Sequence, residues 1–226
     1  MNILALETAT EACSVALWHE GEITQLLKVA PREHVKLLLP MIDQLLANAS
    51  VSVKQLDAIA FGRGPGSFTG LRIAAGITQG IAFGAEIPVI PVSTLAALAQ
   101  GVIREHGQQH VLVALDARMQ EVYWAAYEKH KDSVSLLGDE VVCSPDKVSV
   151  PDGEQWVGAG SGWSEYKEQL DRQYRPSQEY PDACPQACDI AHLAAIKFMA
   201  GEAVIADLAQ PIYLRNNVAN KPKINA

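Results

Sequence analysis

The sequence predicts an α/β fold of two similar lobes that face each other across a cleft. Size and composition allow this, because 226 residues with 49% apolar side chains can bury one large core or two small ones. An internal repeat supports it: residues 4–7 and 113–116 are both short apolar runs that end on an acid. In both places a turn, a second strand, a polar hairpin and a third strand follow in the same order. Helices then alternate with strands, as in other α/β domains.

The first copy is predicted to be a three-stranded meander followed by alternating helices and strands. Apolar and alternating patterns indicate strands at residues 3–6, 13–18, 23–29, 58–62 and 89–92. Pro31 marks the entrance to a helix through Ala49, since proline is favoured at helix starts. Helical spacing predicts two further helices, one over residues 68–84 and one that is capped by Ser93 and ends near His106.

The second copy is less regular. We expect strands at residues 111–116 and 121–127, a charged loop at 128–132 that leads to a third strand, a strand at 156–160 and a helix at 190–201. Residues 165–184 are polar and contain proline, so they are expected to be partly helix and partly surface loop. These patterns divide the chain into an N-terminal α/β lobe, 1–106, and a C-terminal α/β lobe, 107–226, whose last residues could pack back on the first lobe.

Charge and apolar segments argue against several classes of protein. Eighteen Lys and Arg against 26 Asp and Glu give a net charge of −8, unlike a protein that grips a phosphate backbone over its whole surface. The uncharged, glycine-rich stretch at residues 73–85 is shorter than the roughly 20 apolar residues of a membrane helix. The first residues show no basic leader, so we expect a cytoplasmic protein. Four cysteines in a chain of this length do not indicate a disulfide framework.

Both repeated acids, Glu7 and Asp116, are expected at the cleft, each where a strand ends and a tight turn begins. Such positions can hold a metal, a water or a phosphate through magnesium. Thr8 and Thr10 would add hydroxyl groups to a phosphate site, and Arg118 would add a positive charge. The alternative is that the acids only stabilise their own turns and that Arg118 pairs with a nearby acid. Neither turn has the paired glycines or the lysine of a strong nucleotide site.

The most distinctive segment is the glycine-rich stretch at residues 62–72, Gly-Arg-Gly-Pro-Gly-Ser-Phe-Thr-Gly-Leu-Arg. It lacks the glycine-lysine-serine/threonine end of a phosphate-binding loop. It is also not a serine-hydrolase elbow, because Pro65 and Thr69 stand where that motif needs glycines. We therefore interpret it as a sharp turn in which Ser67 caps the next helix, with partner contact as an added role.

Two helices carry more apolar or glycine surface than one core needs. Gly76, Gly80 and Gly84 recur every four residues in the helix at 68–84, and each costs roughly 0.8–1 kcal/mol relative to alanine, so a packing reason is expected. The helix at 32–49 has an apolar stripe that continues onto one flank. We expect a subunit interface there, and packing of the glycines against the protein's own sheet is the alternative. The expected interface residues are His34, Leu37, Leu38, Met41, Leu45, Phe68, Arg72, Gly76 and Gly80.

Four segments together resemble the bacterial TsaB family, formerly called YeaZ. They are residues 6–16, 62–72, 116–123 and 213–217, in this order, and the resemblance covers nearly the whole chain. The resemblance implies a duplicated, two-lobe actin-like or sugar-kinase-like ATPase fold, which is related to ribonuclease H. This agrees with the repeat described above.

The resemblance also implies a function in making threonylcarbamoyladenosine, the modified base beside the anticodon of transfer RNAs that read codons starting with A. Family members pair with a larger relative, TsaD, which holds the metal and transfers the threonylcarbamoyl group, and a small ATPase, TsaE, joins them. Where the catalytic relative has a histidine-x-x-x-histidine motif, this chain has Thr94 and Leu98, which cannot replace imidazole ligands. We therefore expect a scaffold with no catalytic residue and no metal, and with ATP and a divalent metal bound by its partners.

By the same resemblance, the TsaD interface uses the first two long helices, and this surface would support a homodimer when TsaD is absent. Transfer RNA would be held mainly through the complex, and only Arg215, Lys221 and Lys223 near the end of this chain are candidates for contacting it. Two other classes stay open. One is a nucleotide-dependent ATPase or kinase that uses the cleft residues, and the other is a glycoprotease-like peptidase, for which the sequence offers neither an activated nucleophile nor a metal site.

Overall fold

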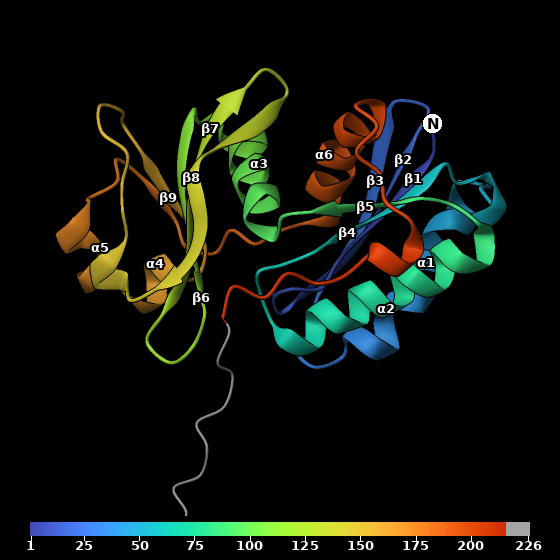
Figure 1. Cartoon of the computed structure of the whole chain (residues 1–226), viewed down its shortest axis with the longest axis horizontal. Coiled ribbons are helices and arrows are strands. Elements are labelled where there is room, and N and C mark those ends of the chain that lie inside the picture. The colour runs from blue at the N-terminus through green and yellow to red at the C-terminus, as the bar shows by residue number, and fades with distance from the viewer. Residues whose placement is uncertain (216–226) are drawn as a thin grey trace, which may run out of the picture.

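The computed structural model describes residues 1–215, which form two five-stranded sheets flanked by helices (Figure 1). The strands of the first sheet are β1 (Ile3–Glu7), β2 (Ala12–His19), β3 (Glu22–Val29), β4 (Ala58–Gly62) and β5 (Val89–Val92). The strands of the second sheet are β6 (His110–Asp116), β7 (Val122–His130), β8 (Ser133–Cys143), β9 (Val157–Ala159) and β10 (Glu179–Tyr180).

The two sheets have the same topology. The first runs β3-β2-β1-β4-β5 and the second β8-β7-β6-β9-β10, with the first three strands of each copy antiparallel and the last two parallel to the first. Glu7 and Asp116 end the matching strands β1 and β6. The predicted repeat is therefore confirmed, and with it the duplicated α/β fold expected of the actin-like, ribonuclease H-like class.

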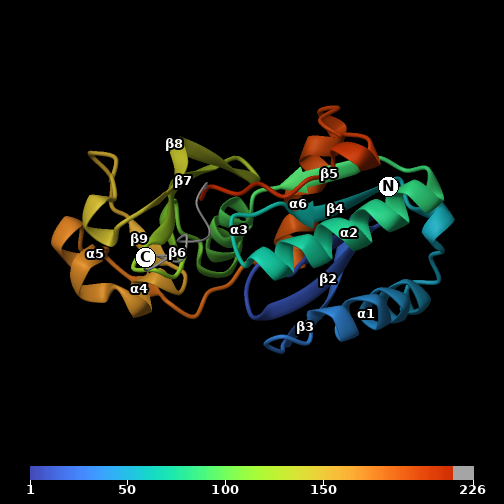
Figure 2. The same ribbon diagram turned by 60° about the horizontal axis from the view of Figure 1, so that its bottom comes forward.

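The first sheet is covered on both faces. Figure 2 shows α1 (His34–Asn48) and α2 (Phe68–Ala85) side by side on one face, where their apolar side chains share a core with Leu4 and Phe61. On the other face α6 (Ala187–Met199) packs against the small residues of the sheet. The C-terminal helix thus returns to the first sheet, and burial on both faces explains the nearly unbroken apolar runs of β1 and β4.

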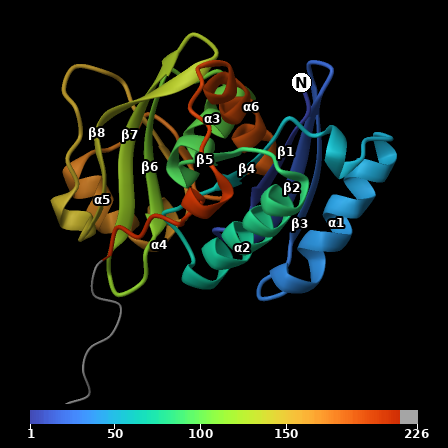
Figure 3. The ribbon, with the colours of Figure 1, turned by 45° about the vertical axis from the view of Figure 1, so that its right-hand side comes forward.

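The second sheet carries α3 (Thr94–His106) on one face and α4 (Gly162–Glu165) with α5 (Lys167–Gln173) on the other. Helix α3 therefore lies in the first lobe by chain order but packs on the second sheet, and it lies beside α6 between the two sheets (Figure 3). The division into lobes at residue 106 stays a prediction. Across residues 1–215, no helix combines the length and the apolar character needed to cross a membrane.

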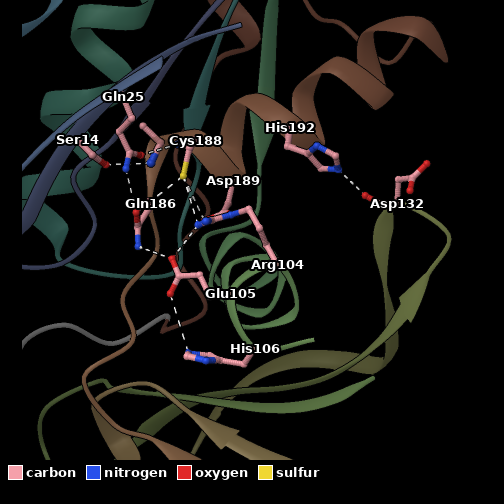
Figure 4. A network of polar contacts seen from close by, with 11 residues as sticks. Ser14, Gln25, Arg104, Glu105, His106, Asp132, Gln186, Cys188, Asp189 and His192 are labelled. Carbon is pink, nitrogen blue, oxygen red and sulfur yellow. Dashed lines mark hydrogen bonds and ion pairs between the residues drawn. The ribbon is translucent and has the colours of Figure 1, made fainter. Parts of the chain in front are cut away.

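Polar contacts join the two central helices to each other and to the first sheet (Figure 4). Arg104 on α3 donates to Asp189 on α6 from Nε at 2.9 Å and from Nη2 at 3.1 Å, and the Asp189 side chain is only 1% exposed. The start of α6 is held by Ser14, which accepts from the backbone N–H of Ala187, and by Gln25, which accepts from that of Cys188. This ion pair, in which Asp189 is buried and Arg104 is partly exposed, is thus a direct link between the helices that pack on different sheets.

Most predicted elements are present, and the differences lie in the second copy. Strand β7 continues through the predicted charged loop to His130, where it pairs with Ser133, so the loop is a tight turn. The charged side chains at the tip of this hairpin, Lys129, Lys131 and Asp132, are exposed, and backbone pairing identifies the segment up to His130 as a strand. Strand β10 is two residues long and was predicted only as part of a polar segment. Both predicted helix caps are confirmed, because Ser67 accepts from the Gly70 N–H and Ser93 from those of Leu95 and Ala96.

Candidate functional site

A cleft of about 1060 Å³ lies between the two lobes. Thr10, Ser67 and Phe68 line it from the first lobe, while Asp116 and Arg118 line it from the second. This confirms that the repeated turns approach a common cavity. Four further residues line the cleft without a sequence pattern that predicts it, namely Ser161, Ser164, Glu165 and Tyr213. The serines and Glu165 come from the less regular part of the second copy, where no period indicates which side chains face inward.

Glu7 does not line this cleft, because the glycine-rich loop seals it inside the first lobe. Its Oε1 accepts a hydrogen bond from Ala9 N at 2.5 Å, and a side chain at Gly62 would meet Oε2 at 1.9 Å, so only glycine allows this approach. Burial raises the pKa of Glu7 to about 7, although backbone hydrogen bonds from Ala9 and Thr8 oppose the rise. The expectation that this acid points into the cleft is therefore wrong.

The two threonines of the first turn have different surroundings. Thr8 is fully buried and its hydroxyl donates to Gly70 O at 2.8 Å, so it cannot hold a phosphate in the cleft. Thr10 lines the cleft, and its hydroxyl accepts from Ala12 N at 3.3 Å. Only Thr10 of this pair stays available as a cleft residue.

The turn after Asp116 both stabilises itself by hydrogen bonds and lines the cleft, which are the two alternatives that the sequence left open. Asp116 accepts from Arg118 N at 2.8 Å and from the Tyr166 hydroxyl at 2.9 Å, so it does stabilise its own turn. Arg118 also forms an ion pair with Asp116 at 3.0 Å, but the Arg118 side chain is 80% exposed at the cleft. Three consecutive residues, 118–120, have φ angles near +60°, in the left-handed region that most residues other than glycine avoid. Contacts from elsewhere must hold such a turn.

Arg215 supplies these contacts. Its guanidinium donates to Glu121 Oε2 and to Arg118 O, and its side chain is only 16% exposed. Arg215 is therefore engaged by the turn, which argues against a contact with nucleic acid, and that contact stays a prediction. The two other candidates of this kind, Lys221 and Lys223, lie outside the described residues.

The predicted interface residues of α1 are mostly buried. Leu38, Met41 and Leu45 belong to the core shared with the sheet, and His34 is also buried, with Nε2 3.3 Å from Ala12 O. Leu37 is half-buried. These four buried side chains are therefore not available to a partner, contrary to the expectation, because α1 turns its apolar stripe inward. The outward apolar residues are Val35, 65% exposed, and Leu39, 49% exposed.

The predicted interface residues of α2 do reach the surface. A side chain at Gly76, Gly80 or Gly84 would meet nothing within 4 Å, so these glycines do not pack against the protein's own sheet. Phe83 is 78% exposed beside them and was not among the predicted interface residues. Helical spacing could have indicated it, because residues three apart, such as Gly80 and Phe83, lie on the same face of a helix. At the start of the helix Phe68 is 44% exposed, and the Arg72 guanidinium stacks 3.8 Å from its ring centroid.

The positions that match the histidine motif are not open either. Thr94 and Leu98 are both buried at the first turns of α3, and the Thr94 hydroxyl lies 3.5 Å from Glu7 Oε2. Across residues 1–215, no three or more His, Cys, Asp or Glu side chains are grouped so that they could share a metal ion.

Comparisons with known proteins give one consistent result. A family model described as TsaD, tRNA N6-adenosine threonylcarbamoyltransferase, matches residues 28–221. The tRNA threonylcarbamoyladenosine biosynthesis protein TsaB of Escherichia coli (strain K12) is 42% identical, with 98% of this chain and 97% of that protein covered. TsaB of Haemophilus influenzae is 41% identical, covering 98% and 96%. The structure of YeaZ from Pseudomonas aeruginosa is 48% identical over 94% of this chain and 99% of that one, with a TM-score of 0.91.

Proposed function

This chain belongs to the TsaB family of tRNA threonylcarbamoyladenosine biosynthesis proteins, and from that membership we propose that it is the non-catalytic partner of a TsaD-type threonylcarbamoyltransferase. In this function it pairs with the larger subunit and activates it. The subunits together transfer the threonylcarbamoyl group to N6 of the adenosine beside the anticodon. ATP, a divalent metal, TsaE and transfer RNA enter through the partners.

The observation that carries the proposal is the outer surface of α1 and α2. We call this surface the helix face and define it as Val35, Leu39, Phe68, Arg72, Gly76, Gly80, Phe83 and Gly84. Its apolar side chains are exposed on two neighbouring helices, and exposed apolar side chains on such a helix pair are typical of a protein interface. The glycines leave open space above α2, so the backbone of a partner helix can approach closely.

The chemistry of the helix face favours a protein over a nucleic acid. Phosphate backbones are bound by lysine and arginine, whereas the only charged member of the face is Arg72. Arg72 is also engaged, because it stacks on Phe68 and donates from Nε to the Tyr213 hydroxyl at 3.2 Å. The net charge of −8 also disfavours binding of a phosphate backbone. An apolar helix pair of a related subunit is the better match.

A second candidate function is nucleotide binding or hydrolysis in the cleft. The volume of about 1060 Å³ and the exposed Arg118 favour it. The sealed Glu7 weighs against hydrolysis, because only one of the two repeated acids faces the cavity. ATP turnover by the isolated chain tests this candidate, and turnover that Asp116→Asn abolishes would favour an ATPase over a scaffold.

The test of the main proposal is complex formation with the TsaD protein of the same cell, followed by light scattering. We expect wild type to form a one-to-one pair and Gly80→Arg to bind at least about tenfold more weakly, since the new side chain fills the space left for the partner. The variant itself should fold, because nothing lies within 4 Å of the new Cβ. Without TsaD, any homodimer of wild type should become a monomer in the variant.

Gln173→Arg is the matched control, because it adds the same charge at an exposed position at the end of α5 on the other lobe. This control should bind like wild type. Equal binding of folded Gly80→Arg would place the interface elsewhere. Failure of wild type to bind would refute the proposed function.

A further inference from the structure

A second, smaller cavity lies at the junction of the lobes and shares no lining residue with the cleft. Its volume of about 300 Å³ is at the lower end for small-molecule sites. Elements of both lobes contribute, because Arg63 follows β4 and Ser93 precedes α3, while Tyr127 and Glu140 lie on β7 and β8. Helix α6 closes one side with Leu193, Ile196 and Lys197. Figure 1 shows α3, α6 and the β7–β8 hairpin around this junction.

Glu140 is fixed in this cavity by two hydroxyl groups. Ser93 Oγ accepts from two backbone N–H groups of α3, so its single proton is donated to Glu140 Oε1. The Tyr127 hydroxyl donates to the same oxygen at 2.5 Å. Burial, and then the charge of Glu140, raise the pKa of Tyr127 well above its ordinary value, so the phenol keeps its proton. Within residues 1–215, no hydrogen bond reaches the other oxygen, Oε2.

Arg63 is the unexplained group. Its Nε is buried and has no hydrogen-bond partner among the described residues. Leaving a buried donor unpaired costs roughly 1–3 kcal/mol, and more when the group is charged, so native proteins satisfy such groups with water, an ion or a ligand. The backbone of Arg63 is held at both ends, because its N–H donates to Val92 O at 2.8 Å and its carbonyl accepts from Ile212 N at 2.7 Å. The backbone from which the Arg63 side chain extends is therefore held in place.

Arg63 and Glu140 do not neutralise each other. No ion pair within 4.0 Å joins them in the part of the chain that the structure describes, although both line the cavity. The other two charged lining residues, Lys197 and Glu202, pair with each other. A ligand with one charge of either sign would gain from one group and be repelled by the other. A ligand with both charges satisfies both.

We propose that this cavity binds a small zwitterionic amino acid, with its carboxylate on Arg63 and its ammonium group on Glu140. The remaining lining residues supply a wall for an aliphatic side chain, since most of them are apolar: Val92, Ala96, Val134, Leu136, Leu193 and Ile196. This site uses the arginine of the glycine-rich segment, which the proposed partner contact leaves unused. It does not depend on the proposed function.

The test titrates the isolated, full-length chain with L-valine and follows backbone and methyl NMR shifts of the lining residues. Two analogues of the same shape separate the charges: isovalerate lacks the ammonium group, and L-valinamide lacks the carboxylate. We expect saturable binding of L-valine and at least about tenfold weaker binding of either analogue, since each loses one charge-assisted contact. Inorganic phosphate should not compete. Equal binding of isovalerate or phosphate would show a simple anion site and overturn the proposal, as would no shift at tens of millimolar L-valine.

Variants distinguish a binding arginine from a structural one. Arg63→Met should remove binding and leave thermal unfolding unchanged or improved, because it replaces the stem of the side chain and removes an unpaired buried donor. Glu140→Gln keeps an acceptor for Ser93 and Tyr127 but should weaken L-valine binding at least about tenfold. Arg175→Gln, at an exposed site on the other lobe, is the control and should change neither. If Arg63→Met loses stability, Arg63→Gln replaces it because glutamine also lacks the charge, and unchanged L-valine binding by either folded variant refutes the assignment.

Discussion

Replacing Glu7 with glutamine should change how the stability of this protein depends on pH. The folded protein raises the pKa of this buried carboxyl from 4.5 to about 7. Between these values the folded state binds the proton and the unfolded state does not, so the free energy of unfolding falls as the pH rises through this window. Since one pH unit corresponds to about 1.4 kcal/mol, the ionised carboxylate lowers the free energy of unfolding by about 3 kcal/mol above pH 7.

Glutamine keeps the shape of the protonated acid and an oxygen that can accept from Ala9 N. We therefore expect Glu7→Gln to be close to wild type in stability at pH 5 and more stable by up to about 3 kcal/mol at pH 8. Urea unfolding at intervals between these pH values measures the difference, which cancels the other titrating groups. Glu22→Gln, at an exposed site on β3, is the control for the loss of a surface carboxylate. A gain that shrinks as the pH rises would refute the reasoning, because it would mean that folding favours the charged form.

Three further changes test other parts of the structure. Gly80→Ala should raise the free energy of unfolding by about 0.8–1 kcal/mol, seen as a rise in Tm of about 2–4 °C, because the new Cβ meets open space; a fall would show internal packing. Arg104→Met should lower the free energy of unfolding by about 1–3 kcal/mol, because it leaves the buried Asp189 carboxyl without its cationic partner, and adding Asp189→Leu should recover most of the loss in chemical denaturation. Arg215→Ala should leave the affinity of the complex for transfer RNA and its salt dependence unchanged, because Arg215 is paired with Glu121; a shallower salt slope in a filter-binding titration would show a phosphate contact instead.

The fold could be predicted from the sequence because the two copies of the repeat show the same order of elements, so each copy supports the assignment of the other. Two apolar runs that end on an acid, each followed by the same strand order, restrict the topology strongly, and β1 and β6 occupy matching places in their sheets. The direction of each helix face was harder. On α1 apolar residues cover more than one stripe, so the choice between Leu38 and Leu39 as the core residue depends on packing against β2 rather than on spacing.

The surroundings of Glu7 and Arg215 could not be predicted, because residues far away in the sequence determine them. Glu7 is sealed by a loop that begins 55 residues later in the chain, and the approach depends on the missing side chain of Gly62. The pattern around Glu7 is the same whether that loop covers it or not. Arg215 is likewise placed by Glu121, 94 residues away, so its charge alone suggested a surface role. In both cases the local sequence specifies the group and only tertiary contact specifies what it faces.

The two copies of the acidic turn have diverged in a way that connects the helix face to the cleft. In the first copy, residues 62–70 close over Glu7 and Thr8 and then lead directly into α2, whose outer row carries the glycines. From the start of α2, the rings of Phe68 and Tyr213 lie 5.4 Å apart, and two residues later Arg215 holds the turn of the second copy. Helix α2, the segment at residues 213–215 and the turn of the second copy are therefore joined by one series of contacts beside the cleft. In the second copy Asp116 stays at the cleft. Of the two repeated acids, the one that faces the cavity therefore belongs to the turn that Arg215 holds.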